Sequence, residues 1–195
     1  MTTLIAFATK QSGMVLCADL RVTHNNRLLT DSASKIVYSK NSVSVAAAGN
    51  WGAIGVVAAL LIDHEADMPI PNNSYTATKF ALWLRGLLLD NDLRPDVDPS
   101  EKDYTVGMLP CEFLITTTNG IITITAGLDV YINTRFASLG SGAPFALGAM
   151  SALHSSGSDY CPQAFAKRIY AIVASLDTDT SADFDLVVAS GESND

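Results

Sequence analysis

Threonine at position 2 carries two groups that together can perform nucleophilic catalysis. The chain opens with MTTLIAFATK, so removal of Met1 leaves Thr2 with a free α-amine beside its hydroxyl. The hydroxyl is a nucleophile, and the amine, whose unperturbed pKa is about 7.7–8.0, can take the proton near neutral pH. Thr2 is small enough for a methionine aminopeptidase to remove Met1. The alternative interpretation is structural, with Thr2 as the polar first residue of a β-strand.

Two charged residues in apolar surroundings indicate what could activate such a threonine. Asp19 ends the apolar run GMVLCAD, and Lys35 interrupts the run SASKIV. A charge in such surroundings is costly unless it is paired. A pair of Asp19 with Lys35 is either an ion pair that only holds the core, or an electropositive centre that lowers the pKa of a neighbouring nucleophile or amine. The residues alone leave both interpretations open.

The sequence offers little for other common kinds of catalysis. The three histidines have no metal-binding spacing, and the three cysteines lie far apart without a C-x-x-C pair. The stretch Gly140-Ser141-Gly142 precedes a helical pattern but lacks the lysine of a phosphate loop. We therefore expect no metal and no cofactor.

The elements that must position these residues follow a clear order along the chain. Strand patterns come first, then two helices, a polar loop, a hairpin, a short strand, two more helices and a final strand. Asn119-Gly120, inside the hairpin, is typical of a type I′ turn. The strands are expected over residues 3–9, 13–20, the end of 27–40, 42–49, 111–128 as a hairpin, 137–140 and 184–190, and the helices over 51–68, 74–90, 141–156 and 162–176.

This order predicts the α+β fold class. Pairs of consecutive helices between groups of strands do not fit the alternation of a doubly wound parallel sheet. Two antiparallel sheets packed face to face, each covered on the outside by a helix pair, would bury all the apolar faces in a four-layer αββα sandwich. No repeat or linker interrupts the 195 residues, so we expect one domain over residues 1–195.

Composition and charge exclude several classes of partner. The net charge of -8 argues against a nucleic-acid partner, because phosphate binding draws on clusters of Lys and Arg. The sequence contains no run of 18 apolar residues, so no membrane-spanning helix is predicted. No secretory signal is visible either. Cys17 and Cys111 lie in apolar runs and are expected to be buried thiols. These features predict a cytoplasmic protein.

Several motifs, taken in order, resemble those of proteasome β-subunits. The stretch TTLIAFATKQSGMVLCADLRVT has the family's Thr-Thr start, a strand, a Gly turn and a second strand ending Ala-Asp-x-Arg-x-Thr. In the family an Asp and a Lys lie sixteen residues apart, as Asp19 and Lys35 do, and a Gly follows fourteen residues later, here Gly49. The resemblance implies the fold of an N-terminal-nucleophile (Ntn) hydrolase.

The later part of the chain continues this resemblance, with some departures. Gly140-Ser141-Gly142 matches a family motif ahead of a helix, and Asp177 with Thr180 matches an Asp-x-x-Ser motif before the last strand. Thr180 stands where Ser is commoner, the first turn is one residue longer, and Trp51 is larger than usual near the substrate pocket. With only Met1 before Thr2, the chain is similar to the simple bacterial proteasome-like peptidases that have no long propeptide.

The resemblance implies a role for each matching residue. Thr2 supplies the nucleophile and, through its amine, the general base. Lys35 favours the ionised nucleophile, and Asp19 orients and compensates Lys35. The remaining catalytic roles fall to Ser141, Asp177 and Thr180, which would hydrogen-bond the amine and a water, and to Gly49, whose N–H would donate to the oxyanion.

The resemblance also implies how a peptide would be held. Thr23 and the strand around Gly49 would pair with an extended peptide. The pocket for the residue before the scissile bond would have no charged member, which predicts a preference for apolar side chains. The pocket residues would be Val22, Ala33, Val37, Ala47 and Trp51.

The function implied is that of a threonine peptidase that hydrolyses peptide bonds of unfolded proteins inside a ring of identical chains. A separate ATPase ring is a possible partner. Two alternatives remain: an Ntn amidohydrolase acting on a small amide, and a non-catalytic ring subunit.

Overall fold

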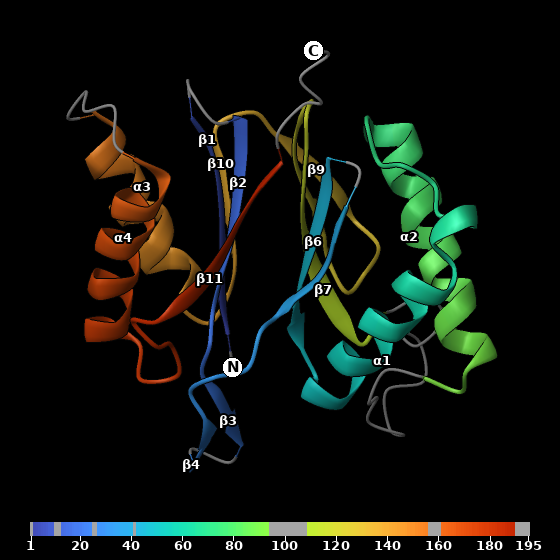
Figure 1. Cartoon of the computed structure of the whole chain (residues 1–195), viewed down its shortest axis with the longest axis horizontal. Helices are drawn as coiled ribbons and strands as arrows, with labels where there is room; N and C mark the ends of the chain where they lie inside the picture. Colours follow the sequence, from blue (N-terminus) through green and yellow to red (C-terminus); the bar gives the residue numbers. More distant parts are fainter. Residues whose placement is uncertain are drawn as a thin grey trace.

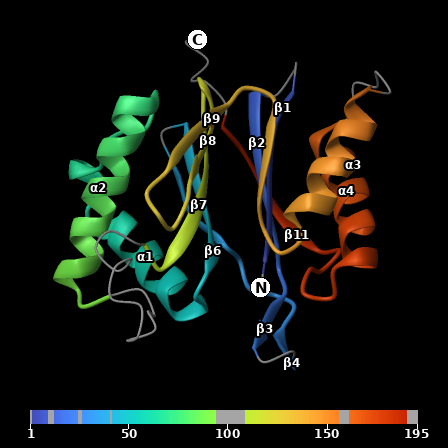
Figure 2. The same ribbon diagram turned by 180° about the vertical axis from the view of Figure 1, so that it is seen from behind.

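The computed structural model describes residues 2–9, 13–24, 27–40, 42–93, 109–155 and 161–189, which form four layers (Figures 1 and 2). The first sheet is antiparallel, in the order β10-β1-β2-β11, and comprises β1 (Thr3–Thr9), β2 (Gly13–Asp19), β10 (Phe136–Gly140) and β11 (Phe184–Ala189). The second is also antiparallel, in the order β5-β6-β7-β8-β9, and comprises β5 (Ile36–Lys40), β6 (Val43–Gly49), β7 (Cys111–Thr117), β8 (Gly120–Ile124) and β9 (Val130–Asn133). A short hairpin of β3 (Val22–His24) and β4 (Arg27–Thr30) stands apart from both sheets.

One pair of helices covers the outer face of each sheet, as Figure 1 shows. The helices α3 (Ala143–Ser155) and α4 (Pro162–Leu176) cover the four-stranded sheet, and α1 (Trp51–Asp63) and α2 (Ser74–Asp90) cover the five-stranded sheet. The α+β class and the four-layer αββα sandwich predicted from the sequence are therefore confirmed.

Three buried clusters fill the spaces between the layers. Leu61 and Phe80 from the helices pack with Phe113 on the outer face of the five-stranded sheet. Phe7 and Ile169 belong to the cluster between the four-stranded sheet and its helices. The third cluster lies between the two sheets and includes Leu4, Leu16 and Leu114. Burial of these apolar side chains is the main favourable contribution to folding.

Alternation along β6 sends neighbouring residues to different layers. Val45 and Ala47 belong to the cluster beneath α1 and α2, whereas Ala46 and Ala48 belong to the cluster between the sheets. This is the two-residue period of a β-strand, whose successive side chains point to opposite faces. The alternation matters for the site, because β6 ends at Gly49 beside the start of β1.

The first strand is interior to its sheet, and this fixes the position of Thr2. Strand β1 pairs on one side with β10, where Thr3 lies opposite Gly140. It pairs on the other side with β2, where Leu4 lies opposite Ala18. The start of β1 therefore lies between the ends of β2 and β10, close to Asp19 and Ser141.

Some local expectations were wrong. The hairpin loop consists of Thr118 and Asn119, since Thr117 pairs with Gly120, and neither loop residue has a positive φ. The turn is therefore not type I′, which requires positive φ at both central residues. Helix α1 ends at Asp63 rather than near residue 68, and a short 3₁₀ turn (Glu65–Asp67) follows.

Other segments were not singled out, or cannot be compared with the structure. The sequence pattern missed β9 and did not separate β3 and β4 from their neighbours. The expected polar loop over 91–103 is described only as far as residue 93. Within the described part of the chain, no helix combines the length and apolar character needed to cross a membrane.

Candidate active site

Thr2 lies at the edge of a pocket between the two sheets. The pocket has a volume of about 360 Å³, and its lining includes Thr2, Gly49, Glu112 and Ser141. Thr2 itself is 4% exposed. Its carbonyl oxygen accepts a hydrogen bond of 2.9 Å from the N–H of Ser141, which fixes the backbone of Thr2 against the end of β10. Three of the residues predicted to be catalytic, Thr2, Gly49 and Ser141, therefore line one pocket.

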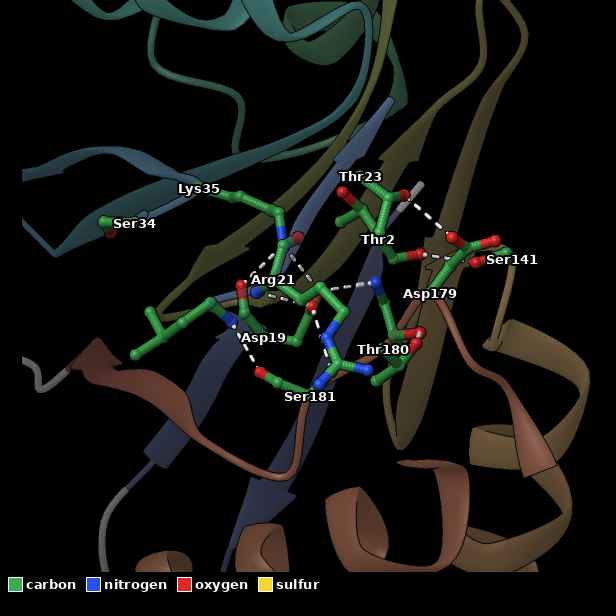
Figure 3. A network of polar contacts seen from close by, with 12 residues as sticks. Thr2, Asp19, Arg21, Thr23, Ser34, Lys35, Ser141, Asp179, Thr180 and Ser181 are labelled. Carbon is green, nitrogen blue, oxygen red and sulfur yellow. Dashed lines mark hydrogen bonds and ion pairs between the residues drawn. The ribbon is translucent and has the colours of Figure 1, made fainter. Parts of the chain in front are cut away.

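Asp19 and Lys35 form a buried ion pair beneath the start of β1 (Figure 3). The Lys35 ammonium lies 2.8 Å from the Asp19 carboxylate, and the two side chains are 1% and 0% exposed. The ammonium also donates to the carbonyl oxygens of Asp19 and Arg21, each at 2.7 Å. These bonds use all three N–H groups of Lys35, so any effect of Lys35 on Thr2 must be electrostatic.

Burial and pairing act in opposite directions on this ion pair. Burial raises the pKa of Asp19, and the Lys35 charge and hydrogen bonds from backbone N–H groups oppose the rise without cancelling it. Burial lowers the pKa of Lys35, and the Asp19 charge opposes that change. Both directions follow from the cost of a charge removed from water. Lys35 therefore gives up its proton more readily than an ordinary lysine.

Thr3, which the sequence pattern did not single out, connects the ion pair to Thr2. Its N–H donates to the Asp19 carboxylate at 2.8 Å, and its carbonyl oxygen accepts from the Tyr170 hydroxyl at 3.0 Å. Its hydroxyl bonds that of Thr180. Each polar group of Thr3 is thus held by a different element, and Thr2 is held through it. The doubled threonine in the opening stretch was the available signal.

A hydrogen-bonded chain of side chains continues on the other side of Thr2. The hydroxyls of Ser141 and Thr180 each donate to the Asp177 carboxylate at 2.8 Å. Burial raises the pKa of Asp177, but the hydrogen bonds from Thr180, Ser141 and the N–H of Asp179 help to outweigh it and hold the pKa below its usual range. The structure therefore brings together Ser141, Asp177 and Thr180, and their role toward the amine and a water stays a prediction. In the position expected for Ser, the hydroxyl of Thr180 makes the bond to Asp177.

The glycines of the Gly-Ser-Gly stretch are required by the close approach of β1. Gly140 has φ of +91°, and a Cβ there would overlap the carbonyl oxygen of Thr2. A Cβ on Gly142 would overlap the Thr3 hydroxyl and a Val173 methyl group. Only residues without a Cβ leave room for the first strand at this place. The glycines thus allow Ser141 to bond Thr2 directly.

Gly49 lies at the junction of β6 and α1, on the pocket side. Its φ is +144°, and a Cβ there would press against the carbonyl oxygen of Pro110. The next residue, Asn50, caps α1 by accepting from the N–H groups of Gly52 and Ala53. Asn50 thereby provides a partner for two of the backbone N–H groups that the start of a helix leaves without an intrahelical bond.

Thr23 and Arg21 line a second hollow, of about 460 Å³, beside the β3–β4 hairpin. The Thr23 hydroxyl donates to the Asp179 carboxylate at 2.7 Å (Figure 3). The Arg21 side chain pairs with Asp31 and donates to the carbonyl oxygen of Thr178. These bonds tie the hairpin to the segment that carries Asp177. Arg21 and Asp179 were not among the predicted site residues, although Arg21 is part of the Ala-Asp-x-Arg-x-Thr motif.

Two of the five residues expected to form the apolar substrate pocket lie on the other side of β6. Val37 and Ala47 are buried in the cluster beneath α1, and Val22 is 5% exposed. Ala33 is half-buried, and Trp51 is 42% exposed at the start of α1. None of the five lines the pocket beside Thr2. Their role in substrate selection stays a prediction.

The described residues were expected to hold no metal ion. Among these residues, no three His, Cys, Asp or Glu side chains are grouped so that they could hold a metal ion.

Comparisons with solved structures place this geometry in a known fold. The chain is similar to BPH from Thiobacillus denitrificans, with 20% identity, a TM-score of 0.78, and coverage of 99% of this chain and 100% of that one. It is also similar to the eukaryotic HslV from Trypanosoma brucei, with 19% identity, a TM-score of 0.70 and coverage of 96% and 98%. BPH has also been solved in complex with epoxomicin.

These similarities extend over nearly the whole of each chain. The protein therefore has the Ntn-hydrolase fold of proteasome β-subunit-like proteins, as the sequence motifs predicted. The sequence itself matches no protein-family model and no curated protein. What the site does is therefore inferred from its own geometry.

Proposed function

We propose that the protein is an N-terminal threonine peptidase. The observation that carries the proposal is the placement of Thr2 at a pocket, with the buried Lys35 and Asp19 beneath β1 and Ser141 bonded to Thr2 itself. A free amine at Thr2 is required, so whatever precedes Thr2 must be removed. In this proposal residues 1–195 act as one domain in the cytoplasm.

The proposed reaction begins with proton transfer from the Thr2 hydroxyl to the α-amine of the same residue. The Thr2 oxygen attacks the peptide carbonyl carbon, and the N–H of Gly49 stabilises the oxyanion that forms. Loss of one donor of this kind elsewhere costs about 2.7–4 kcal/mol in transition-state stabilisation. The amine then protonates the leaving nitrogen as the carbon–nitrogen bond breaks, and an ester on Thr2 remains.

Water completes the cycle by hydrolysing the ester. The α-amine takes a proton from the attacking water, and the acid product leaves as the Thr2 hydroxyl is restored. Ser141, Asp177 and Thr180 orient the amine and this water. Lys35 favours the negative charge that develops on the Thr2 oxygen, and Asp19 holds Lys35 in place and compensates its charge.

Substrates are proposed to be unfolded polypeptides, held in an extended conformation. Thr23 and the backbone around Gly49 would pair with the peptide as added strands. Val22, Ala33, Val37, Ala47 and Trp51 would form the pocket for the side chain before the scissile bond. None of these five is charged, so peptides with an apolar residue at that position should be cleaved fastest.

The experiment that tests the function compares the wild type with the Thr2→Ala variant. The active wild-type protein should lack Met1 by intact mass, because an amide nitrogen at Thr2 cannot act as the base. Thr2→Ala should keep the fold and lose peptide hydrolysis entirely. Retention of activity by protein that carries Met1 on every chain would disprove the mechanism.

Epoxomicin provides a second readout that does not depend on turnover. The compound is bound to BPH in one of the solved structures similar to this chain. Binding of epoxomicin to the processed wild type, but not to Thr2→Ala, is expected if the two sites share their chemistry.

A wild type that hydrolyses small amides but not peptides would favour the amidohydrolase alternative. A processed wild type inactive on both, which still forms a ring, would favour the non-catalytic subunit.

A further inference from the structure

A carboxylate that the proposed mechanism does not use lies in the same pocket as Thr2. Glu112 lines this pocket and belongs to β7, where it pairs with Ala48 of β6. Cross-strand partners lie on the same face of a sheet. Ala48 belongs to the cluster between the sheets, so Glu112 also faces that space, on the side of Thr2 and Ser141.

Glu112 has no partner for its charge among the residues that the structure describes. The described residues that line the pocket include no Lys, Arg or His. Glu112 is half-buried, and burial raises the pKa of its carboxyl. A carboxylate that is partly removed from water without a counter-charge is held at a free-energy cost, which a cation entering the pocket would offset.

We propose that Glu112 is a specificity-determining residue that binds the cationic side chain of a Lys or Arg in the substrate, next to the bond that is cleaved. This inference rests on the proposed peptidase function. It adds a second subsite, distinct from the proposed apolar subsite, whose residues Val37 and Ala47 are buried on the opposite face of the same sheet.

The geometry of an extended peptide relates the two subsites. Successive side chains of a strand point to opposite faces. A peptide whose apolar side chain enters the pocket on the helix side therefore directs the adjacent side chain toward the space between the sheets, where Glu112 lies. The favoured substrates carry an apolar residue and a basic residue at neighbouring positions across or beside the scissile bond.

The test is a peptide library randomised at three positions on each side of one scissile bond, cleaved by the wild type and by the Glu112→Gln variant. The wild type should favour Lys and Arg at one position adjacent to the apolar one. Glu112→Gln should lower kcat/KM for those peptides by about tenfold, because a half-buried charge pair is stronger than one on the surface. Peptides that are neutral at that position should be cleaved at unchanged rates. Glu112→Lys should reverse the preference toward Asp and Glu.

Asp90→Asn is the matched control, since it makes the same change in net charge at the exposed end of α2. It should leave the profile unchanged. Three results would overturn the proposal: no basic preference at any position, an equal effect of Glu112→Gln on all peptides, or a change in oligomer mass that makes Glu112 a contact between chains. Each of these can occur while Thr2→Ala remains inactive. The specificity proposal can therefore fail while the peptidase proposal holds. If the peptidase proposal itself were wrong, Thr2→Ala and the wild type would hydrolyse peptides at the same rate.

Discussion

At the scale of single residues, the geometry of the buried ion pair is compatible with both interpretations that the sequence left open, a core ion pair and an electropositive centre beneath Thr2. Asp19 and Lys35 lie in the core, and the same Asp19 carboxylate accepts the N–H of Thr3. The pair therefore holds the start of β1 and lies beneath Thr2 at the same time. A single substitution at either residue changes the stability and the site together, so the two contributions must be separated by design.

A double variant separates them. Lys35→Ala leaves the Asp19 charge buried without its partner, and loss of one member of a buried pair costs about 3–5 kcal/mol in stability. Combining Asp19→Asn with Lys35→Met removes both charges and should restore most of that loss in urea unfolding. Peptide hydrolysis should remain absent in the double variant. Recovery of activity together with stability would show that Lys35 acts only by holding the core.

The lowered pKa of Lys35 predicts that peptide hydrolysis is lost in alkaline buffer at a pH at which the protein is still folded. Because burial lowers this pKa, the ammonium loses its proton below the usual lysine value of about 10.4. A lowered pKa means that the folded state accepts the neutral lysine more easily than the unfolded chain does. Lys35 therefore does not weaken the fold as pH rises, and activity should fall in alkaline buffer before the protein unfolds. Rates and circular dichroism measured on the same samples check this order.

At the scale of elements, the Gly-Ser-Gly stretch can be tested against glycines that have no such constraint. Gly140→Ala would place a methyl group against the Thr2 carbonyl at a positive φ, so both stability and activity should fall. Gly148→Ala, in α3, meets nothing within 4 Å and should raise stability by about 0.5–1 kcal/mol. Thermal unfolding and peptide hydrolysis of both variants give the comparison. Equal behaviour of the two variants would contradict the close approach at Gly140.

The regular elements could be predicted because their apolar periods are long and uninterrupted. Ala77, Phe80, Ala81, Leu84 and Leu88, spaced for one face of a helix, are all buried on α2. The prediction of a type I′ turn at Asn119-Gly120 was wrong because the register of β7 and β8 places Gly120 inside the strand pair. Strand β9 was missed because it is an edge strand with Tyr131 and Ile132 exposed, so it has no buried face that an apolar pattern could reveal.

The candidate site was predictable only where chain order carried the information. Thr2, Asp19, Lys35 and Ser141 stand at spacings that resemble a known family, and the structure brings them together. Glu112 could not be found in this way, because a polar residue at the start of a strand is common. Its significance depends on which sheet it faces, and that is a property of the packed layers.

At the scale of the whole molecule, we expect the active protein to be a ring of identical chains. The pocket beside Thr2 is open to solvent, so an isolated chain would have no wall to exclude folded proteins. In the helix layer of α1 and α2, the large apolar side chains of Ile62 and Leu82 are 63% and 53% exposed. Exposed apolar surface of this kind often marks a contact between chains. Sedimentation of active protein should give a multiple of the 20.6 kDa chain mass. Full activity in a species of 20.6 kDa would contradict the ring.

The hydrogen bonds around Thr3 also set the time at which a chain can become active. Thr180 and Asp177, which complete the site, are synthesised more than 170 residues after Thr3. A ribosome makes Thr2 and Thr3 first and the residues that hold them last, and β11 must then pair with β2 to bring them together. A nascent chain therefore carries its threonine without the means to use it. For the proposed peptidase, this order means that proteins still emerging nearby meet no hydrolytic activity from this chain until its synthesis and folding are complete.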